Sequence, residues 1–363
     1  MKTAIVTTTI NVPVFLKDYT QNVKNNRHDV FFVIIGDKKT PPEVKDYCRG
    51  LENNTGVEIK YLDVEDQERY LTDFTELGNH LLYNSIQRRN IGILIAYQRG
   101  AENIITVDDD NFFVSSDFIR EHTVGVRQKL EVISSKSGWF NVCSFLEEKD
   151  NLSFYHRGFP VNQRWKEERI VMKKSDVRIV VNAGLWLNEP DIDALTRLYR
   201  PVTAAKYLRE DNFALAKGTW SPFNSQNTAL ARDIIPAYFL SPYIGRYDDI
   251  WASYIICAIS DHLGDSIAFG KPIVRQDRNV HNFWKDLEKE KMGMILTDRL
   301  CEILRKTNLG GRDYRSCFSE ITKALEQEIT NSDIFSLEEQ GYLKKFVEGL
   351  NIWQRTFQRL EKL

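Results

Sequence analysis

Asp108 to Asp110, three consecutive aspartates, are the clearest sign of chemistry in this sequence, because they directly follow a short apolar run. Neighbouring carboxylates repel one another, and at the end of a buried strand they are costly unless a positive charge lies beside them. An Asp-x-Asp pair at a strand end suits Mg²⁺ or Mn²⁺, hard cations that take carboxylate and phosphate oxygens. The alternative is a solvated acidic turn without a ligand.

The second half of the chain adds further polar candidates. The pair Asp248-Asp249 opens an apolar helical run. It either complements the positive end of the helix dipole or presents a general base to a hydroxyl group. The stretch NAGLWLNEPDIDA (182–194) is expected to expose Trp186 beside two more carboxylates. His281 follows a predicted strand, and a lone histidine is more often a packing or surface residue than a ligand.

A scaffold must position these residues, and the first half of the chain alternates strand-like runs with segments of helical apolar spacing. Strands are expected at 3–10, 29–37, 56–64 and 103–108, and helices at 12–26, 41–54 and 83–100. This order, with its short connections, predicts a parallel, doubly wound α/β sheet. Ligands of such sheets bind beyond the carboxyl ends of the strands, where Asp37 and the three aspartates stand.

The second half of the chain has a less regular pattern. Residues 218–233 form a polar, amide-rich stretch, including Asn227, that is expected to lead into a helix. Residues 242–264 predict a turn followed by an apolar helix ending near Gly264, and 265–274 predict a strand. Neither GxGxxG nor GxxxxGK[ST] occurs, so the dinucleotide fingerprint and the P-loop are both absent.

Composition limits the partners. The 363 residues include 42% apolar and 28% charged residues, and the net charge of −2 gives no reason to expect a nucleic-acid partner. Five scattered cysteines, never spaced CxxC, favour reduced thiols and a cytoplasmic location. The N-terminus lacks the apolar core and cleavage site of a signal peptide. The longest apolar run, Ile91 to Tyr97, is too short to span a membrane.

Four blocks of the sequence resemble the reversibly glycosylated polypeptides, the family that includes the plant UDP-arabinopyranose mutases. They are YNSIQRRNIGILIAYQRGAENIITVDDDN, NAGLWLNEPDIDA, GTWSPFNSQNTALARD and IGRYDDIWASYIICAISDHLG, in that order. The stretches VIIGDKKTP and YHRGFP are more similar to STELLO-type glycosyltransferase domains. The resemblance covers residues 3–283. It implies a GT-A type nucleotide-sugar-binding fold, in which an Asp-x-Asp motif holds Mn²⁺ or Mg²⁺ against the donor diphosphate.

The resemblance also implies roles for individual residues. Asp108, Asp110 and His281 are expected to bind the metal, and Asp248 and Asp249 to form the catalytic carboxylates. The residues expected to contact the nucleotide donor are Thr8, Asp37, Arg88, Arg89, Asn90, Asp108, Asp109, Trp186 and Asn227. Arg157 lies near the arginine that becomes glycosylated in the mutases, but its local pattern, YHRGFP, differs from theirs.

These assignments predict a metal-dependent glycosyltransferase that transfers a sugar from a UDP-sugar to a hydroxyl acceptor. Asp249 is the expected base that deprotonates the acceptor, while the metal and a nearby Arg or His neutralise the departing diphosphate. The alternative is a UDP-sugar mutase, an isomerase that interconverts ring forms without an acceptor. A third reading is a non-catalytic protein of the same fold.

Residues 284–363 are expected to form a helical C-terminal extension to a domain spanning 1–283. Ser336 and Glu339 have the spacing of a capping box. The residues Leu343, Phe346, Leu350, Trp353, Phe357 and Leu360 follow it at steps of three and four. This stripe either packs on the chain's own catalytic domain or pairs two copies into a homodimer.

Overall fold

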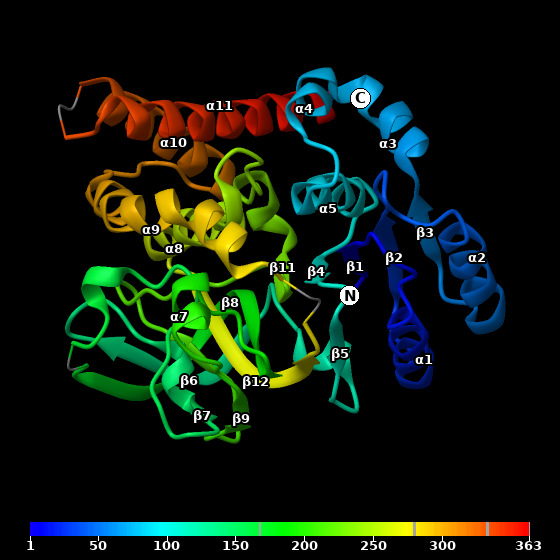
Figure 1. The fold of residues 1–363 in the computed structure, drawn as a ribbon, viewed down its shortest axis with the longest axis horizontal. Coiled ribbons are helices and arrows are strands. Elements are labelled where there is room, and N and C mark those ends of the chain that lie inside the picture. Colours follow the sequence, from blue (N-terminus) through cyan, green and yellow to red (C-terminus); the bar gives the residue numbers. More distant parts are fainter. Residues whose placement is uncertain (167, 279–280, 332–333, 363) are drawn as a thin grey trace.

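Four parallel strands form the N-terminal half of a twelve-stranded sheet, in the order β3-β2-β1-β4 (Figure 1). Their bounds are β1 Thr3–Thr8, β2 Val30–Ile35, β3 Ile59–Leu62 and β4 Asn103–Val107. The computed structural model describes residues 1–166, 168–278, 281–331 and 334–362. Each strand falls within its predicted run, and β2 is buried at every position, as a continuous apolar run requires.

The helices of this half cross between the parallel strands. They are α1 Leu16–Asn26, α2 Val44–Thr55, α3 Val64–Leu71, α4 Thr75–His80 and α5 Arg89–Gln98. Helices α3 and α4 were not predicted. Helix α5 lies directly on the sheet at Gly92, where a Cβ would come 2.5 Å from Cγ1 of Val6. This close approach brings the first residue of α5 to the end of β4.

Beyond β4 the sheet becomes mixed. Strand β11 pairs antiparallel with β4, and the long strand β8 pairs with β11, β6 and β12. The elements of this half are β5 Asn111–Phe113, α6 Phe118–Glu121, β6 Arg127–Ser135, β7 Leu146–Glu148, β8 Ile170–Asn188, α7 Ala194–Tyr199, β9 Ala204–Tyr207, β10 Phe213–Leu215, β11 Asn227–Ala231 and β12 Ser266–Gln276. The predicted strand at 265–274 is confirmed. The helix expected at the end of 218–233 is wrong, because that stretch ends in β11 and a short 3₁₀ segment, Arg232–Ala237.

Helix α8, Asp248–Leu263, is buried along most of its length and ends at Gly264, whose φ of 79° is left-handed. The prediction of a turn and helix over 242–264 is confirmed. Because α8 is surrounded by the rest of the chain, its apolar residues occupy every face, and its first turn is also buried. Asp248 and Asp249 therefore lie inside the protein and do not cap an exposed helix end.

Three long helices complete the chain: α9 Phe283–Lys306, α10 Tyr314–Asn331 and α11 Leu337–Leu360 (Figure 1). The capping box of Ser336 and Glu339 is confirmed at the start of α11. The apolar stripe of α11 packs within its own chain: Trp353 is fully buried, stacks on Phe239 and donates to the carbonyl of Ile235. Of the two alternatives predicted for the stripe, the structure shows packing on the chain's own domain, and the homodimer stays a prediction.

The fold class predicted from the sequence, an α/β protein with a doubly wound sheet and a helical C-terminal extension, is confirmed. The boundary at residue 283 stays a prediction, although it coincides with the first residue of α9. No helix in the described part of the chain is long and apolar enough to cross a membrane.

Candidate functional site

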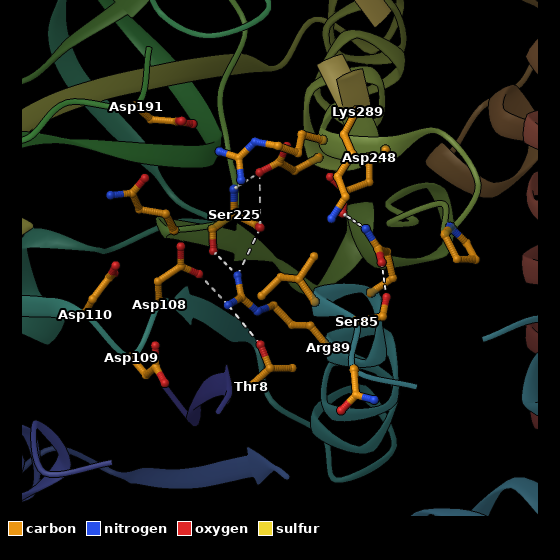
Figure 2. A pocket seen from close by; sticks show the side chains of 18 of the residues that line it. Thr8, Ser85, Arg89, Asp108, Asp109, Asp110, Asp191, Ser225, Asp248 and Lys289 are labelled. Carbon is orange, nitrogen blue, oxygen red and sulfur yellow. Dashed lines mark hydrogen bonds and ion pairs between the residues drawn. The ribbon is translucent and has the colours of Figure 1, made fainter. Parts of the chain in front are cut away.

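A pocket of about 480 Å³ opens at the carboxyl ends of β1 and β4 (Figure 2). Of the residues predicted to act at the site, those that line this pocket are Thr8, Arg89, Asp108, Asp109, Asp110, Asp248, Asp249 and His281. The predicted donor-binding residues that do not line it are Asp37, Arg88, Asn90, Trp186 and Asn227. The strand-end location expected for the ligand site therefore agrees with the pocket, but five of the predicted contacts have other roles.

The three aspartates differ in what balances their charge. Asp108 forms an ion pair with Arg89, whose guanidinium is buried and also donates to the carbonyl of Ser225 at 2.6 Å. Asp109 accepts a hydrogen bond from the Thr9 hydroxyl at 2.7 Å. Asp110 has only distant donors, and burial together with the charges of Asp108 and Asp109 raises its pKa to about 6. Arg89 thus supplies one positive charge at this strand end. Asp110 has no ion pair among the described residues.

Arg88 and Asn90, on either side of Arg89, form structural contacts inside the protein. Arg88 donates from Nε to Gln67 at 2.6 Å and lies over the Tyr83 ring. Asn90 donates to the carbonyl of Leu240 and accepts from its amide, at 2.8 and 3.1 Å. Both side chains are buried away from the pocket. The basic-Asn pattern predicted to face the nucleotide contributes only Arg89 to the pocket wall.

Asp37 also has a local role. Its carboxylate accepts from the amides of Lys38 and Ser85, at 2.8 and 3.1 Å. It therefore ties the end of β2 to the loop that precedes α5. Ser85 lies on the pocket wall, so Asp37 supports the pocket from behind and does not line it.

Trp186 and Asn227 belong to the core of the sheet. Trp186 is 1% exposed and packs against the His156 ring, so the expectation that it is exposed is wrong. The Asn227 side chain is paired with Nε2 of His122 at 2.8 Å. Trp186 lies on β8 and Asn227 on β11. The sequence does not show which strands flank β8 and β11, so the burial of these two side chains was not predicted.

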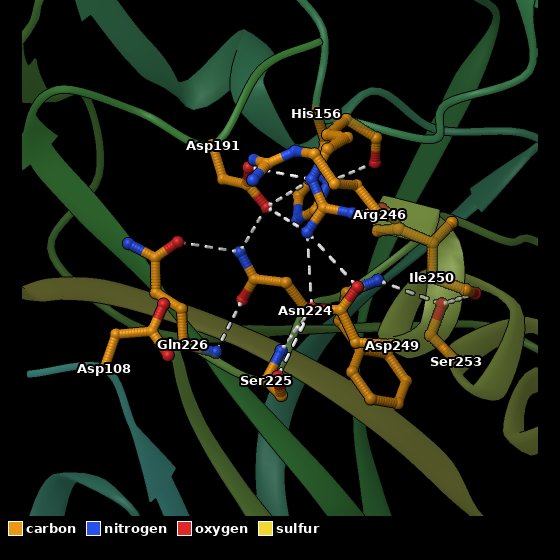
Figure 3. Close-up of polar contacts among 12 residues, drawn as sticks. Asp108, His156, Asp191, Asn224, Ser225, Gln226, Arg246, Asp249, Ile250 and Ser253 are labelled. Atoms are coloured by element: carbon orange, nitrogen blue, oxygen red, sulfur yellow. Dashed lines mark hydrogen bonds and ion pairs between the residues drawn. The ribbon is translucent and has the colours of Figure 1, made fainter. Parts of the chain in front are cut away.

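The two carboxylates of α8 have separate partners, and they are labelled in Figure 2 (Asp248) and Figure 3 (Asp249). Asp249 accepts from the amide of Ser225 at 3.0 Å and from Nη2 of Arg157 at 3.2 Å. Asp248 accepts from the side-chain amide of Gln87 at 2.7 Å. Burial, with the neighbouring charge of Asp249, raises the pKa of Asp248 to about 7. Asp249 is already hydrogen-bonded to Arg157 and Ser225, whereas Asp248 has a pKa close to neutral pH.

Arg157 is the central cation of the site. Its Nε and Nη2 donate to Asp191 at 2.9 Å, Nη2 also reaches Asp249, and Nη1 donates to the carbonyl of Arg246. Burial alone would lower the pKa of Arg157, but Asp191 and Asp249 raise it well above its ordinary value. Arg157 lines the pocket. In the sequence, Arg157 stands in YHRGFP and its partner Asp191 stands 34 residues further along the chain, so no local pattern joins them.

His281 does not join the aspartates in a metal site. Its Nδ1 is paired with Asp286, on the first turn of α9, at 2.9 Å. The β12 side chain that reaches Asp110 is instead Gln276, at 3.4 Å. Within the described ranges, no three His, Cys, Asp or Glu residues are grouped closely enough to hold a metal. The predicted triad of Asp108, Asp110 and His281 is therefore not assembled. Residues 279 and 280, just before His281, are outside the described ranges.

The doubly wound sheet has its pocket, with acidic residues and buried arginines, at the carboxyl ends of its strands, where open α/β sheets bind their ligands. A family model described as "Reversibly glycosylated polypeptide" matches residues 3–358, and the chain belongs to this family. The match continues through the C-terminal helices, so the expectation that the resemblance ends at residue 283 is wrong.

Two relatives show how far the sequences of the family have diverged. UDP-arabinopyranose mutase 2 of Arabidopsis thaliana is 26% identical over 265 residues, which cover 71% of this chain and 68% of the relative. UDP-arabinopyranose mutase 1 of Oryza sativa subsp. japonica is 24% identical over 265 residues, with 71% and 68% covered.

Two solved structures have a more distant likeness. The mannosyltransferase PcManGT from Pyrobaculum calidifontis, in complex with GDP-Man and Mn²⁺, has a TM-score of 0.41 and 8% identity, covering 99% of this chain and 84% of that one. TarS 1-349 of S. aureus has a TM-score of 0.36 and 9% identity, covering 99% and 91%. The family assignment rests on the sequence match.

Proposed function

We propose that this protein binds a UDP-sugar in the strand-end pocket and interconverts the ring forms of its sugar, as a UDP-sugar mutase. The observation that carries the proposal is the position of Arg157, held on the pocket wall between Asp191 and Asp249. An inverting transferase uses a carboxylate to deprotonate the acceptor hydroxyl. Asp249, predicted for that role, is buried and already paired with Arg157 and Ser225. Names of the family relatives support the same choice.

The reaction must break and remake the bond between the anomeric carbon and the diphosphate. In the proposed step, a C–N bond forms to a nitrogen of Arg157 while the C–O bond breaks and its electron pair leaves on UDP. The nitrogen's proton passes to Asp249, which already accepts from this guanidinium. Asp191 accepts from it too, but, against the effect of burial, the charge of Arg157 holds the pKa of Asp191 well below its ordinary value. The sugar then opens and recloses through a different hydroxyl, and the reverse displacement returns it to UDP. Atoms and charge balance without a further reactant.

Asp108 and Asp110 fit a divalent cation because burial and mutual repulsion outweigh the compensation that Asp110 receives from Gln276 and Arg278. Two carboxylates plus substrate phosphates are a usual set of Mg²⁺ ligands. When bound, Mg²⁺ or Mn²⁺ supplies positive charge to the departing diphosphate. Arg89 fixes the orientation of Asp108, and Thr9 fixes that of Asp109.

The test is an incubation without acceptor. Purified protein, Mn²⁺ and UDP-arabinopyranose should yield UDP-arabinofuranose, resolved by anion-exchange chromatography, with no net release of UDP. Arg157→Lys, which keeps a cation but loses the paired guanidinium, should abolish the conversion and should not acquire a pentosyl unit in an intact-mass measurement. Release of UDP only after a hydroxyl acceptor is added would replace this proposal with the glycosyltransferase.

A further inference from the structure

Arg278 is a pocket residue for which the sequence suggested no role. It follows β12, and its backbone amide donates to the carboxylate of Glu189 at 3.0 Å, which fixes the chain at this position. Its side chain is only 7% exposed and lies on the wall of the pocket that contains Asp110. A buried guanidinium brought to a pocket wall in this way is expected to have partners for its donors.

The partners of Arg278 are incomplete among the residues that the structure describes. Its nearest carboxylate atom, Oδ1 of Asp191, is 3.6 Å from Nη2, and its Nε has no hydrogen-bond partner. The Nε of Arg89 is also without a partner, but each of the other pocket arginines donates at least once from its side chain within 3.0 Å, as Arg278 does not. Arg89 donates to Ser225, Arg157 to Asp191 and Arg246 to Glu290. The guanidinium of Arg278 therefore has N–H groups without hydrogen-bond partners in the described part of the chain, although its side chain is largely shielded from water.

The surroundings of Arg278 identify the ligand. Its charge acts on both Asp110 and Asp191, which lie along one side of the pocket in Figure 2. A carboxylate-lined wall would repel an anion unless a cation faced it, and the fork of a guanidinium matches the oxygens of a phosphate group. Asp191 is shared: Oδ1 faces Arg278, and Oδ2 accepts from Arg157. A phosphate on Arg278 is therefore adjacent to Arg157.

We infer that Arg278 binds the sugar-bearing, terminal phosphate of the nucleoside diphosphate. This inference rests on the proposed function, in which Arg157 receives the sugar. The phosphate next to Arg157 must then be the one bonded to the anomeric carbon, not the one bonded to the nucleoside. Arg278 holds that phosphate in place and balances the negative charge that it gains when the C–O bond breaks.

The experiment compares two nucleotides on the full chain by calorimetry in the presence of Mn²⁺. UDP has the terminal phosphate, and UMP lacks it. Arg278→Gln should weaken UDP binding roughly 10- to 100-fold, the effect of losing a hydrogen bond to a charged group, and should leave UMP binding unchanged. Arg275→Gln is the matched control, because Arg275 is an exposed arginine three residues earlier that pairs with Asp277. It should bind both nucleotides as the wild type does.

Each other outcome is decisive. Unchanged UDP affinity in Arg278→Gln, with normal wild-type binding, would overturn the inference and leave the proposed function intact. Equal losses for UDP and UMP would also overturn it, because they would assign Arg278 to the shape of the pocket. A wild type that binds neither nucleotide would overturn both. Should the Gln variant fail to fold, Arg278→Lys serves instead: it keeps the charge, loses the fork, and should show a smaller loss confined to UDP.

Discussion

At the scale of single side chains, the pocket aspartates differ in how their charge is balanced. Asp108 has the guanidinium of Arg89 and Asp109 has the hydroxyl of Thr9, while the side chain of Gln276 is 3.4 Å from Asp110. A bound cation therefore gains most from Asp110, and removal of this carboxylate leaves the network of the other two unchanged.

Asp110→Ala should abolish Mn²⁺-dependent binding of UDP without lowering the thermal unfolding midpoint, because the buried carboxylate that it removes has a raised pKa and costs stability at neutral pH. The physical reason is that Asp110 lies at a strand end, where it is proposed to bind the cation, and contributes no apolar packing. Titration calorimetry with UDP, with and without Mn²⁺, measures the effect. Asp46→Ala, at an exposed carboxylate on α2, is the control and should bind normally. UDP affinity that stays Mn²⁺-dependent in the Asp110 variant would remove this residue from the metal site.

Asp248 is a second residue whose charge is opposed by its surroundings. Its pKa in the folded protein is about 7, far above that of a solvated aspartate. The folded state thus holds the proton more tightly than the unfolded state, so stability is lost as pH rises from about 4 to about 7. The near-isosteric amide of Asp248→Asn has no such loss and can still accept from Gln87.

Asp248→Asn should therefore be more stable than the wild type at pH 8, by an amount on the order of 3 kcal/mol. The difference should shrink as pH falls and be small at pH 4. Urea denaturation at a series of pH values measures it. A difference between variant and wild type that is constant over this range would show that ionisation of Asp248 is not the cause.

At the scale of elements, α9 forms one wall of the site by packing on the 3₁₀ turn Gly245–Tyr247 that precedes α8. Gly293 makes this possible, since a Cβ there would lie 2.1 Å from Cγ of Tyr247. Along the same contact, Arg246 of the turn donates to Glu290 of α9 at 2.9 Å. The helix that follows the sheet thus fixes the carbonyl to which Arg157 donates.

Gly293→Ala should destabilise the protein by roughly 1–3 kcal/mol, because the ring of Tyr247 has no room to move within the packed core. The midpoint of chemical denaturation measures the loss. Gly341→Ala is the control: Gly341 also lies within a helix, but no atom is within 4 Å of its added Cβ. This control should be neutral or gain up to about 1 kcal/mol from helix propensity. Equal effects of the two substitutions would contradict the packing argument.

At the scale of the whole molecule, the C-terminal helices are part of one folded unit with the sheet domain. Helix α11 packs against α10 and α4, and Trp353 contacts Phe239 and Ile235 in the segment before α8. These contacts use the same apolar stripe that suggested a dimer from sequence alone.

Trp353→Ala should cost roughly 3–5 kcal/mol, the usual loss for a large buried aromatic side chain, without altering the mass of the particle in solution. Denaturation and light scattering measure the two quantities. Leu337→Ala, at a residue that is 87% exposed, should change neither. A stable Trp353 variant with a smaller assembly state would instead identify the stripe as an interface between copies.

The sequence by itself determined the elements whose pattern is local. The apolar run of β2, the strand before the three aspartates, the glycine that ends α8 and the capping box of α11 are all recognisable from neighbours a few residues away. The same locality explains why the strand-end position of Asp108 to Asp110 could be predicted. Burial of β8 and β11 could not, because it depends on which strands flank them.

Only the tertiary structure decided which charges meet. Arg157 and Asp249 are 92 residues apart in the chain, yet they form an ion pair, and Asp191 joins them from a third segment. His281 looked like a metal ligand but pairs with Asp286, whereas Arg278, three residues earlier, lies on the pocket wall. Helix and strand preferences act between near neighbours, but the pairing of buried charges depends on how distant segments pack, and no local pattern contains that information.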